Sequence, residues 1–401
     1  MVIVGGGKAG ARAAVVLRDG GWQGAITLIG EEKLPPYDRP PLSKAAITDV
    51  EEAEPILLLD EAAMQSLNVT WLGGTRAERI DRAAKQVMLA DGRSVAYGKL
   101  LLATGAMARK LPLAGAERAL MLRTFADMQA LRRAFRPGVN VAIIGGGFIG
   151  LELATSAVKR GCTVTVIEAL PRILLRAVPE EIAAVAAKAH ADHGVRIITN
   201  AQIERISGDS VMLKDGTDVK ADILVAGIGA APSLVLAEAS GLALDNGIAC
   251  DAQLRTSDPD IYAAGDCVSF PHATFGGGRM RLEAWRAAQD QAAVAAENMM
   301  GGEKVYDAIP WFWSDQFDLS LQIAGLPAAG ATTVRRPLKD EAFILMYLAA
   351  DGRLVGASGI GVGNTVARDI RLAEMLIAKQ AKPDPAALAD PAVQLKALLK
   401  G

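Results

Sequence analysis

The sequence GGGKAG at residues 5–10 decides the fold, because a second glycine motif, GGGFIG, follows at residues 145–150. Each copy comes after a short β-branched run and opens an Ala- and Leu-rich stretch. An acid closes each unit, Glu31 in the first half and Glu168 in the second. Strand, glycine turn, helix, second strand and acid in this order are the pattern of a dinucleotide-binding fold. Two copies predict two dinucleotides, which is typical of a flavin enzyme that takes electrons from a nicotinamide.

The internal repeat continues beyond the glycine motifs. DG turns at residues 91–92 and 215–216 each lie among short strands that lead to an apolar run, at residues 100–103 and 223–226. Both halves are therefore expected to hold a β-meander, inserted before the last strand of a parallel sheet. From residue 310 onward, strand-like segments followed by a helix favour a third, α+β unit.

Two linker-like segments, at residues 107–112 and 229–233, mark where the second unit is inserted into the first. They predict three domains. The expected division is residues 1–108 together with 233–308, then residues 109–232, then residues 309–401.

The bulk composition is that of an ordinary globular protein with 401 residues, 51% of them hydrophobic. A net charge of −2 gives no electrostatic case for a nucleic-acid or anionic-membrane partner. The apolar stretch at residues 139–158 contains three consecutive glycines and Glu152, so we expect a strand-turn-helix there and no membrane span. Cys162, Cys250 and Cys267 form no CxxC pair, which favours reduced thiols and a cytoplasmic protein.

Each glycine motif lets the backbone approach a pyrophosphate at the N-terminus of a helix, while the acid accepts hydrogen bonds from ribose hydroxyls. A carboxylate at position 168 would repel a 2′-phosphate, so NADH is expected over NADPH, although Arg172 nearby leaves the preference open. The candidate residues are Gly5, Gly7, Gly10 and Glu31 in the first site, and Gly145, Gly147, Ile149, Gly150 and Glu168 in the NADH site.

An extended segment ends at Gly265 and Asp266, from which an exposed carboxylate could reach a cofactor hydroxyl. An N-cap is the alternative for this aspartate. The ATG step that contains Thr104 and Gly105, together with the order of the units, favours a role for Asp266 in binding the flavin.

Lys44 and Glu152 are candidates for the chemistry, but each also has a simpler explanation. A lone lysine is usually solvated, and a glutamate in the first turn of a helix is favoured by the helix dipole. The two matter together only if the fold brings them into one cleft. Trp311, Trp313 and Phe317 belong to an aromatic cluster that fits either a packed domain core or a surface near a cofactor or partner.

The chain resembles the FAD-dependent ferredoxin reductases of bacterial oxygenase systems. The resemblance lies in YDRPPLSK at residues 37–44, LRT at 122–124, TSDP at 256–259, AGDC at 264–267 and WFWSDQ at 311–316. It implies an α/β protein with two Rossmann-like domains of glutathione-reductase type, for FAD and NADH, and a C-terminal α+β domain that covers the flavin. It also implies FAD contacts at Ala9, Glu31, Lys44, Ala77, Arg123, Asp266 and Trp285, and Arg39 lies in the first of the shared motifs.

The resemblance further implies that Lys44 and Glu152 lie beside the flavin on the nicotinamide side, with Trp313 near the flavin toward the ferredoxin. A disulfide reductase needs a cysteine pair near the flavin, which this chain lacks, so the electrons must leave the flavin directly. The resulting hypothesis is an enzyme in which NADH reduces FAD beside Lys44. Two single-electron transfers then reduce two 2Fe–2S ferredoxins, which feed an oxygenase.

Two other functions remain open from the sequence. One is an NADH-dependent reductase of a small molecule such as a quinone or an ascorbyl radical. The other is an interaction scaffold like apoptosis-inducing factor, since fold alone does not fix function. We expect no metal site and a monomer or weak dimer. The residues that could contribute to a basic docking face for an acidic ferredoxin are Arg279, Arg281, Arg335 and Arg336.

Overall fold

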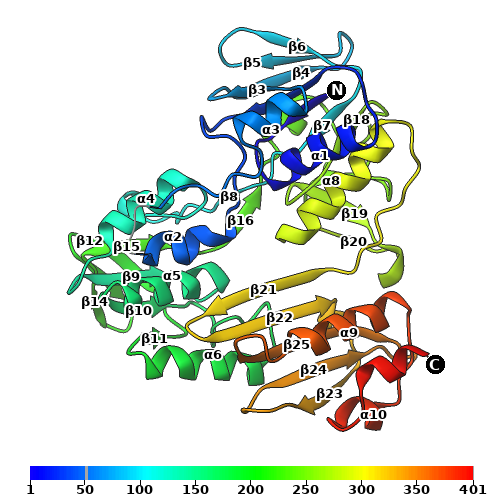
Figure 1. The fold of residues 1–401 in the computed structure, drawn as a ribbon. Coiled ribbons are helices and arrows are strands. Elements are labelled where there is room, and N and C mark those ends of the chain that lie inside the picture. Colours follow the sequence, from blue (N-terminus) through cyan, green and yellow to red (C-terminus); the bar gives the residue numbers. More distant parts are fainter. Residues whose placement is uncertain (50–52, 401) are drawn as a thin grey trace.

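The computed structural model describes residues 1–49 and 53–400. Figure 1 shows three parts: an upper part with both early and later segments of the chain, a part at the left formed by its middle, and a lower part formed by its C-terminal portion. The expected α/β fold with a C-terminal α+β unit is confirmed. Among the described residues, no helix is long and apolar enough to cross a membrane.

The upper part is built on a parallel five-stranded sheet with fully buried three-residue strands at its centre. Two Ala-rich helices, α1 (Lys8–Asp19) and α8 (Trp285–Met299), pack against one another beside it. A shorter helix, α3 (Glu61–Ser66), begins where the Asp60 carboxylate accepts the Ala63 N–H. The strands, in spatial order, are β18 (Ile261–Ala263), β7 (Leu100–Leu102), β1 (Val2–Val4), β2 (Ile26–Gly30) and β3 (Val69–Gly73).

The part at the left repeats this design with a parallel four-stranded sheet. Its helices are α4 (Phe125–Ala134), α5 (Phe148–Lys159) and α6 (Glu180–Asp192). A capping box between Thr124 and Asp127 fixes the start of α4. The strands, in spatial order, are β11 (Arg196–Ile198), β10 (Thr163–Ile167), β9 (Asn140–Ile144) and β15 (Ile223–Ala226).

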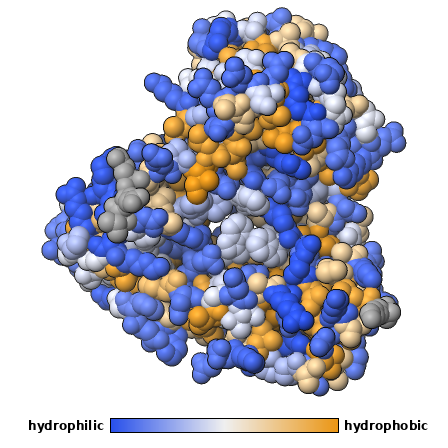
Figure 2. All heavy atoms as spheres, in the orientation of Figure 1, coloured by the Kyte–Doolittle hydropathy of each residue, from blue (hydrophilic) through white to orange (hydrophobic). Residues whose placement is uncertain are grey.

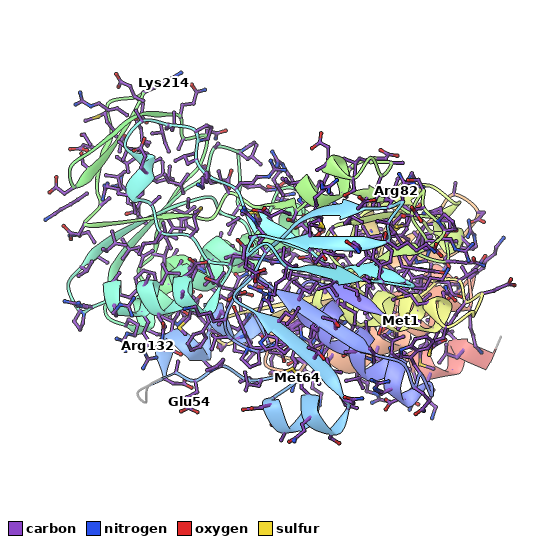
Figure 3. All side chains as sticks on the ribbon, turned by 90° about the horizontal axis from the view of Figure 1, so that it is seen from above. Met1, Glu54, Met64, Arg82, Arg132 and Lys214 are labelled. Carbon is purple, nitrogen blue, oxygen red and sulfur yellow. The ribbon has the colours of Figure 1, made fainter. Side chains whose placement is uncertain are left out.

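Each parallel sheet carries the expected antiparallel meander, with a DG turn between its second and third strands. Figure 3 shows the two meanders far apart, the first near Arg82 and the second near Lys214. The strands of the first meander are β4 (Ala77–Asp81), β5 (Gln86–Leu89) and β6 (Ser94–Ala96); those of the second are β12 (Ile203–Ser207), β13 (Ser210–Leu213) and β14 (Asp218–Lys220).

The two linker-like segments pair with each other between these parts. Strand β8 (Ala106–Ala108) runs antiparallel to β16 (Ala230–Pro232), and together they form a two-stranded ribbon. A short helix, α7 (Val235–Ala239), follows the ribbon. A small sheet of β17 (Ile248–Ala249), β19 (Val268–Pro271) and β20 (Arg279–Met280) completes the upper part.

The lower part is an antiparallel five-stranded sheet on which α9 (Ala367–Ala378) packs. Arg336 lies in this sheet and is only 4% exposed, because it pairs with Asp369 and donates to three backbone carbonyls near the C-terminus. It therefore does not contribute to a docking face, contrary to expectation. The strands are β21 (Trp311–Gln316), β22 (Leu319–Gly325), β25 (Leu354–Val362), β24 (Phe343–Leu348) and β23 (Thr332–Pro337), and α10 (Pro385–Ala389) follows α9.

A short Pro-containing 3₁₀ turn, Pro40–Ser43, leads into α2 (Ala45–Thr48) and lies against the part at the left. Arg132 of α4, labelled in Figure 3, donates to the carbonyls of Ala46, Ile47 and Asp49. These bonds attach the segment around α2 to helix α4 of the part at the left, although it precedes that helix by a long stretch of sequence. Lys44 is thereby held between the two parts.

Candidate active site between the two glycine turns

The first glycine turn joins β1 to α1. Gly5 has φ +126°, and a Cβ there would lie 2.0 Å from the carbonyl oxygen of Ala103. A Cβ on Gly10 would lie 1.9 Å from the oxygen of Gly5, so both positions exclude a side chain. Gly7 instead faces open space, and it begins α1 without a side-chain cap. The turn thus leaves unpaired backbone N–H groups beside a space suited to a pyrophosphate.

The second glycine turn, between β9 and α5, has the same construction. Gly145 has φ +108° and packs against the Gly227 carbonyl, while Gly150 packs against the oxygen of Gly145. Gly147 faces open space at the uncapped start of α5. Ile149, in the first turn of this helix, is 46% exposed. The residues present therefore fit a second pyrophosphate, with an apolar side chain at the mouth of the site.

The two acids differ in what holds them. Glu31 is exposed and has no hydrogen-bond or ion partner among the described residues. Glu168 accepts the N–H groups of Gly146 at 2.7 Å and of Leu170 at 2.8 Å, which fix its carboxylate beside the second turn. Arg172 donates to the carbonyls of Ile173, Leu175 and Val178. It is therefore turned toward its own loop, and does not extend toward a nucleotide phosphate.

Lys44 and Glu152 meet where the three parts of the molecule come together. The Lys44 ammonium lies 2.8 Å from a carboxylate oxygen of Glu152, which is only 4% exposed. Ser43 donates to the same oxygen, and Ser314 of β21 donates to the other at 2.7 Å. Figure 2 shows the face of the molecule hollowed near its centre, in the region that Figure 1 shows between α8 and β21.

Ser43 and Ser314 were not among the candidates from sequence. Both lie within motifs that the resemblance pointed out, but nothing in either motif shows that its hydroxyl faces a carboxylate on α5. Ser156 of α5 in turn holds the backbone of Ser43, because its hydroxyl donates to the Ser43 carbonyl at 2.6 Å. The carboxylate of Glu152 is thus held by donors from two different parts of the chain, which compensates its burial.

Asp266 is not the exposed acid that the sequence suggested. Its side chain is 17% exposed and pairs with Arg123 at 3.1 Å. Burial raises the pKa of Asp266, although the positive charge of Arg123 lowers it. Gly265, just before it, has φ +91° and donates its N–H to Gln291. A strand end with a left-handed glycine turns this carboxylate inward, which a one-dimensional pattern does not show.

The remaining first-site candidates lie on both sides of the first glycine turn. Arg39 pairs with Glu32 at 2.7 Å and donates to the Arg123 carbonyl. The hydroxyl of Thr104 donates to Ser233 O at 2.8 Å, so it helps to hold the linker ribbon. The other positions are the buried Ala9, Gly105 with φ +66° beside the Arg123 guanidinium, and the half-buried Ala77 at the start of β4.

Three tryptophans lie in contact between the upper and lower parts. Trp285 donates its indole N–H to Asp38 at 2.7 Å, and the Lys8 ammonium lies 3.8 Å from its ring centroid. Trp313 meets Trp285 edge to face at 6.3 Å between centroids, and Trp311 stacks on Trp313 at 5.1 Å. The indoles are half-buried. They therefore form a junction between α8 and β21, and not the centre of a domain core.

None of the three thiols belongs to a disulfide. Cys162, Cys250 and Cys267 are buried and unpaired. Burial raises the pKa of each thiol, which makes a thiolate nucleophile unfavourable at neutral pH. In the part of the chain that the structure describes, no group of three or more His, Cys, Asp or Glu side chains could hold a metal ion. The site can bind, orient and stabilise charge, but it offers no cysteine pair to reduce.

Known proteins share this architecture over the whole chain. Residues 1–292 match the family model described as pyridine nucleotide-disulphide oxidoreductase, and residues 311–399 match the one described as reductase C-terminal. The ferredoxin–NAD(+) reductase component of the anthranilate 1,2-dioxygenase system of Burkholderia cepacia is 42% identical over 99% of this chain and 98% of its own. Putidaredoxin reductase of Pseudomonas putida is 36% identical over 100% of this chain and 96% of its own.

A solved structure agrees with these sequence relatives. The reductase in the covalent putidaredoxin reductase–putidaredoxin complex matches with a TM-score of 0.94 and 34% identity, over 100% of this chain and 97% of that one. The match includes the lower part as well as both dinucleotide-binding units. The chain therefore belongs to the pyridine nucleotide-disulphide oxidoreductase family, whose members are oxidoreductases that work with a flavin and NAD(H), and it carries the reductase C-terminal domain.

Proposed function

We propose that this protein is an NADH-dependent ferredoxin reductase that passes electrons from NADH through FAD to a 2Fe–2S ferredoxin. The ferredoxin would supply a bacterial oxygenase that acts on aromatic compounds. The observation that carries the proposal is the Lys44–Glu152 ion pair at 2.8 Å between two glycine turns of the same construction. The buried, unpaired cysteines support direct electron transfer to a partner.

Each part of the chain has a role in this proposal. Residues 1–108 and 233–308 hold FAD, residues 109–232 hold NADH, and residues 309–401 cover the flavin. Asp266 and Arg123 hold the flavin end of FAD, while Glu31 accepts ribose hydroxyls at the adenosine end. A cytoplasmic location is part of the proposal, because buried unpaired thiols fit a reducing compartment.

Bound FAD would accept two electrons from NADH and release them singly to a one-electron carrier. The residues of this chain supply position and charge. Lys44 places a positive charge where negative charge develops, and the two serines fix the carboxylate that orients it. Trp313 lies on the lower part across from Trp285, and faces the side from which the ferredoxin approaches in this proposal.

The coenzyme preference follows from two side chains. Glu168 is fixed by two backbone N–H groups at the mouth of the second turn, where it would accept ribose hydroxyls and repel a 2′-phosphate. Arg172, the one feature of the sequence that left NADPH open, has its donors engaged by three carbonyls of its own loop. Both observations favour NADH.

The decisive experiment is NADH-dependent cytochrome c reduction by the purified protein, with and without a 2Fe–2S ferredoxin of an oxygenase system. We expect strong stimulation by the ferredoxin, since cytochrome c would accept electrons mainly through it. High activity with a quinone and no stimulation by a panel of ferredoxins would replace the proposal with a small-molecule reductase. Absence of NADH oxidation with every acceptor would favour an interaction scaffold.

A further inference from the structure

Trp71 lies across three glycines that come from different segments of the first unit. It belongs to β3 and is half-buried. A Cβ on Gly6 would lie 2.7 Å from the indole ring, a Cβ on Gly30 2.2 Å, and a Cβ on Gly73 2.5 Å. No side chain fits at these three positions while the indole stays in place. The glycines thus leave the space that this ring fills.

The Trp71 ring lies beside the place where the adenosine end of a bound dinucleotide is expected. Gly6 lies within the first glycine turn, between Gly5 and Gly7. Gly30 is the last residue of β2 and directly precedes Glu31. In dinucleotide-binding units the pyrophosphate lies at the glycine turn and the adenosine ribose at the acid. The ring of Trp71 therefore lies between the places that these two groups take, at the carboxyl edge of the sheet.

The second unit shows that the fold does not require this arrangement. Gly30 pairs with Gly73 in the parallel register of the first sheet, directly before Glu31. The corresponding pair in the second sheet is Ile167 with Ile198, directly before Glu168. The position that matches Trp71 is then Arg196, whose side chain is exposed. Where the second unit has two isoleucines and an arginine, the first unit has Gly30, Gly73 and Trp71.

The turn itself also differs between the two units. In the second unit, a Cβ at Gly146 would meet the side chain of Ile173 and the carboxylate of Glu168. In the first unit, the equivalent Gly6 faces the Trp71 ring, and the Glu31 carboxylate has no partner among the described residues. The first unit thus offers an aromatic ring against Gly30 and, at the next residue, a carboxylate free to accept hydrogen bonds.

We propose that Trp71 forms the wall of the adenosine pocket of the flavin site, where it packs against the adenosine half of the dinucleotide while Glu31 accepts its ribose hydroxyls. The inference rests on the proposed function, which places FAD in this unit. Indoles give large rigid apolar contacts, and every nucleic-acid base has a face that an aromatic ring can stack on. Trp71 would thereby select a dinucleotide flavin over a mononucleotide, because FMN has no adenosine to meet it.

The test compares the dissociation constants of FAD and of FMN for the same protein, loaded with one flavin at a time. Trp71→Leu and the milder Trp71→Phe are purified with flavin bound, and flavin release on dilution is followed by the recovery of flavin fluorescence. We expect Trp71→Leu to raise the FAD dissociation constant about tenfold and to leave that of FMN unchanged, with Trp71→Phe in between. Trp22→Leu is the matched control, because Trp22 is also half-buried but lies beyond the far end of α1.

Each outcome of this test has one meaning. Equal weakening of FAD and FMN by Trp71→Leu would show a packing role and overturn the inference, as would unchanged FAD affinity in both variants. Neither result would affect the proposed function, since the wild-type protein would still bind FAD and oxidise NADH. Wild-type protein that binds no flavin at all would instead refute the proposed function.

Discussion

The ammonium of Lys44 lies 2.8 Å from the carboxylate of Glu152, and this contact joins the segment before α2 to α5. Contrary to expectation, Glu152 lies just past the first turn of that helix, which holds no acidic residue. Glu152 is almost fully buried, whereas Lys44 is about one quarter exposed. Ser43 and Ser314 satisfy the rest of the carboxylate. A buried charge of this kind is stable only with its partners in place, so the pair responds strongly to the loss of either member.

Replacement of Lys44 by methionine should slow the reduction of the flavin by NADH about tenfold or more, because it removes the positive charge provided for the developing negative charge. FAD content should stay near that of the wild type, since most of the proposed FAD contacts remain. Stopped-flow absorbance near 450 nm measures the reduction rate. Lys33→Met, at an exposed position, serves as the control. A wild-type reduction rate in Lys44→Met would remove Lys44 from the mechanism.

The hydroxyl of Ser314 donates to Glu152 at 2.7 Å from the C-terminal sheet. Ser314→Ala leaves a lone pair of a buried carboxylate without a donor, so we expect it to lower the free energy of unfolding by about 1–3 kcal/mol. Urea unfolding followed by circular dichroism measures the change. Ser210→Ala, in the second meander, should change the stability by less than about 0.5 kcal/mol. Equal effects of the two variants would mean that the bond to Glu152 contributes nothing.

The repeated glycine turns could be predicted from sequence because their physics is local. A strand end, a glycine with positive φ and a helix start lie within a few residues of each other, so Gly5 and Gly145 identify the folds around them. The DG turns of the two meanders are equally local. The α+β class of the third unit was also predictable, because a run of short strands followed by one helix is typical of that class.

The side-chain contacts that could not be predicted from the sequence join segments that lie far apart along the chain. Ser314 faces Glu152 only because β21 lies against α5, and Trp71 meets Gly6 only because β3 joins the sheet beside β2. The sequence around Arg336 predicts a surface residue, since nothing local shows that its guanidinium is buried against the C-terminal segment. The direction of a long side chain is set by its partners and not by its neighbours in sequence.

Coenzyme preference should respond to Glu168 and not to Arg172. Glu168→Arg removes the carboxylate that repels a 2′-phosphate, so the ratio of kcat/KM for NADH over NADPH should fall about tenfold or more. Arg172→Ala should raise KM for both coenzymes by a similar factor, because its guanidinium holds the loop carbonyls. Steady-state kinetics with both coenzymes measures the ratio. A changed ratio of kcat/KM for NADH over NADPH in Arg172→Ala would show that this arginine distinguishes the two coenzymes.

Acid should destabilise the protein through His190. Burial lowers the pKa of His190 below its ordinary 6.5, because the ring lies in the interior beside Leu151 and Phe317. Below pH 6.5 the unfolded chain therefore binds a proton that the folded chain does not, so stability falls as the pH drops. The slope from one such group is at most about 1.4 kcal/mol per pH unit.

Urea unfolding at pH 7.5, 6.5 and 5.5 tests the role of this histidine. His190→Gln should show a shallower loss of stability toward pH 5.5 than the wild type, whatever its stability at pH 7.5. Part of the slope should remain, because burial also lowers the pKa of His272. His193→Gln is the control, since that ring is exposed at the end of the same helix. Identical slopes in His190→Gln and the wild type would contradict the assignment.

Trp313 should matter for the second half of the reaction and not for the first. Its indole stacks on Trp311 and meets Trp285 edge to face, so it lies at the junction of α8 and β21, where the proposed function has the ferredoxin approach. Loss of a central interface tryptophan typically costs about 2 kcal/mol or more, which predicts at least a tenfold higher KM for the ferredoxin in Trp313→Ala. Reduction of ferricyanide, a small acceptor that needs no docking surface, should keep its wild-type rate. A parallel loss with both acceptors would place Trp313 in the binding of FAD or NADH, whereas an unchanged KM for the ferredoxin would place the docking surface elsewhere on the protein.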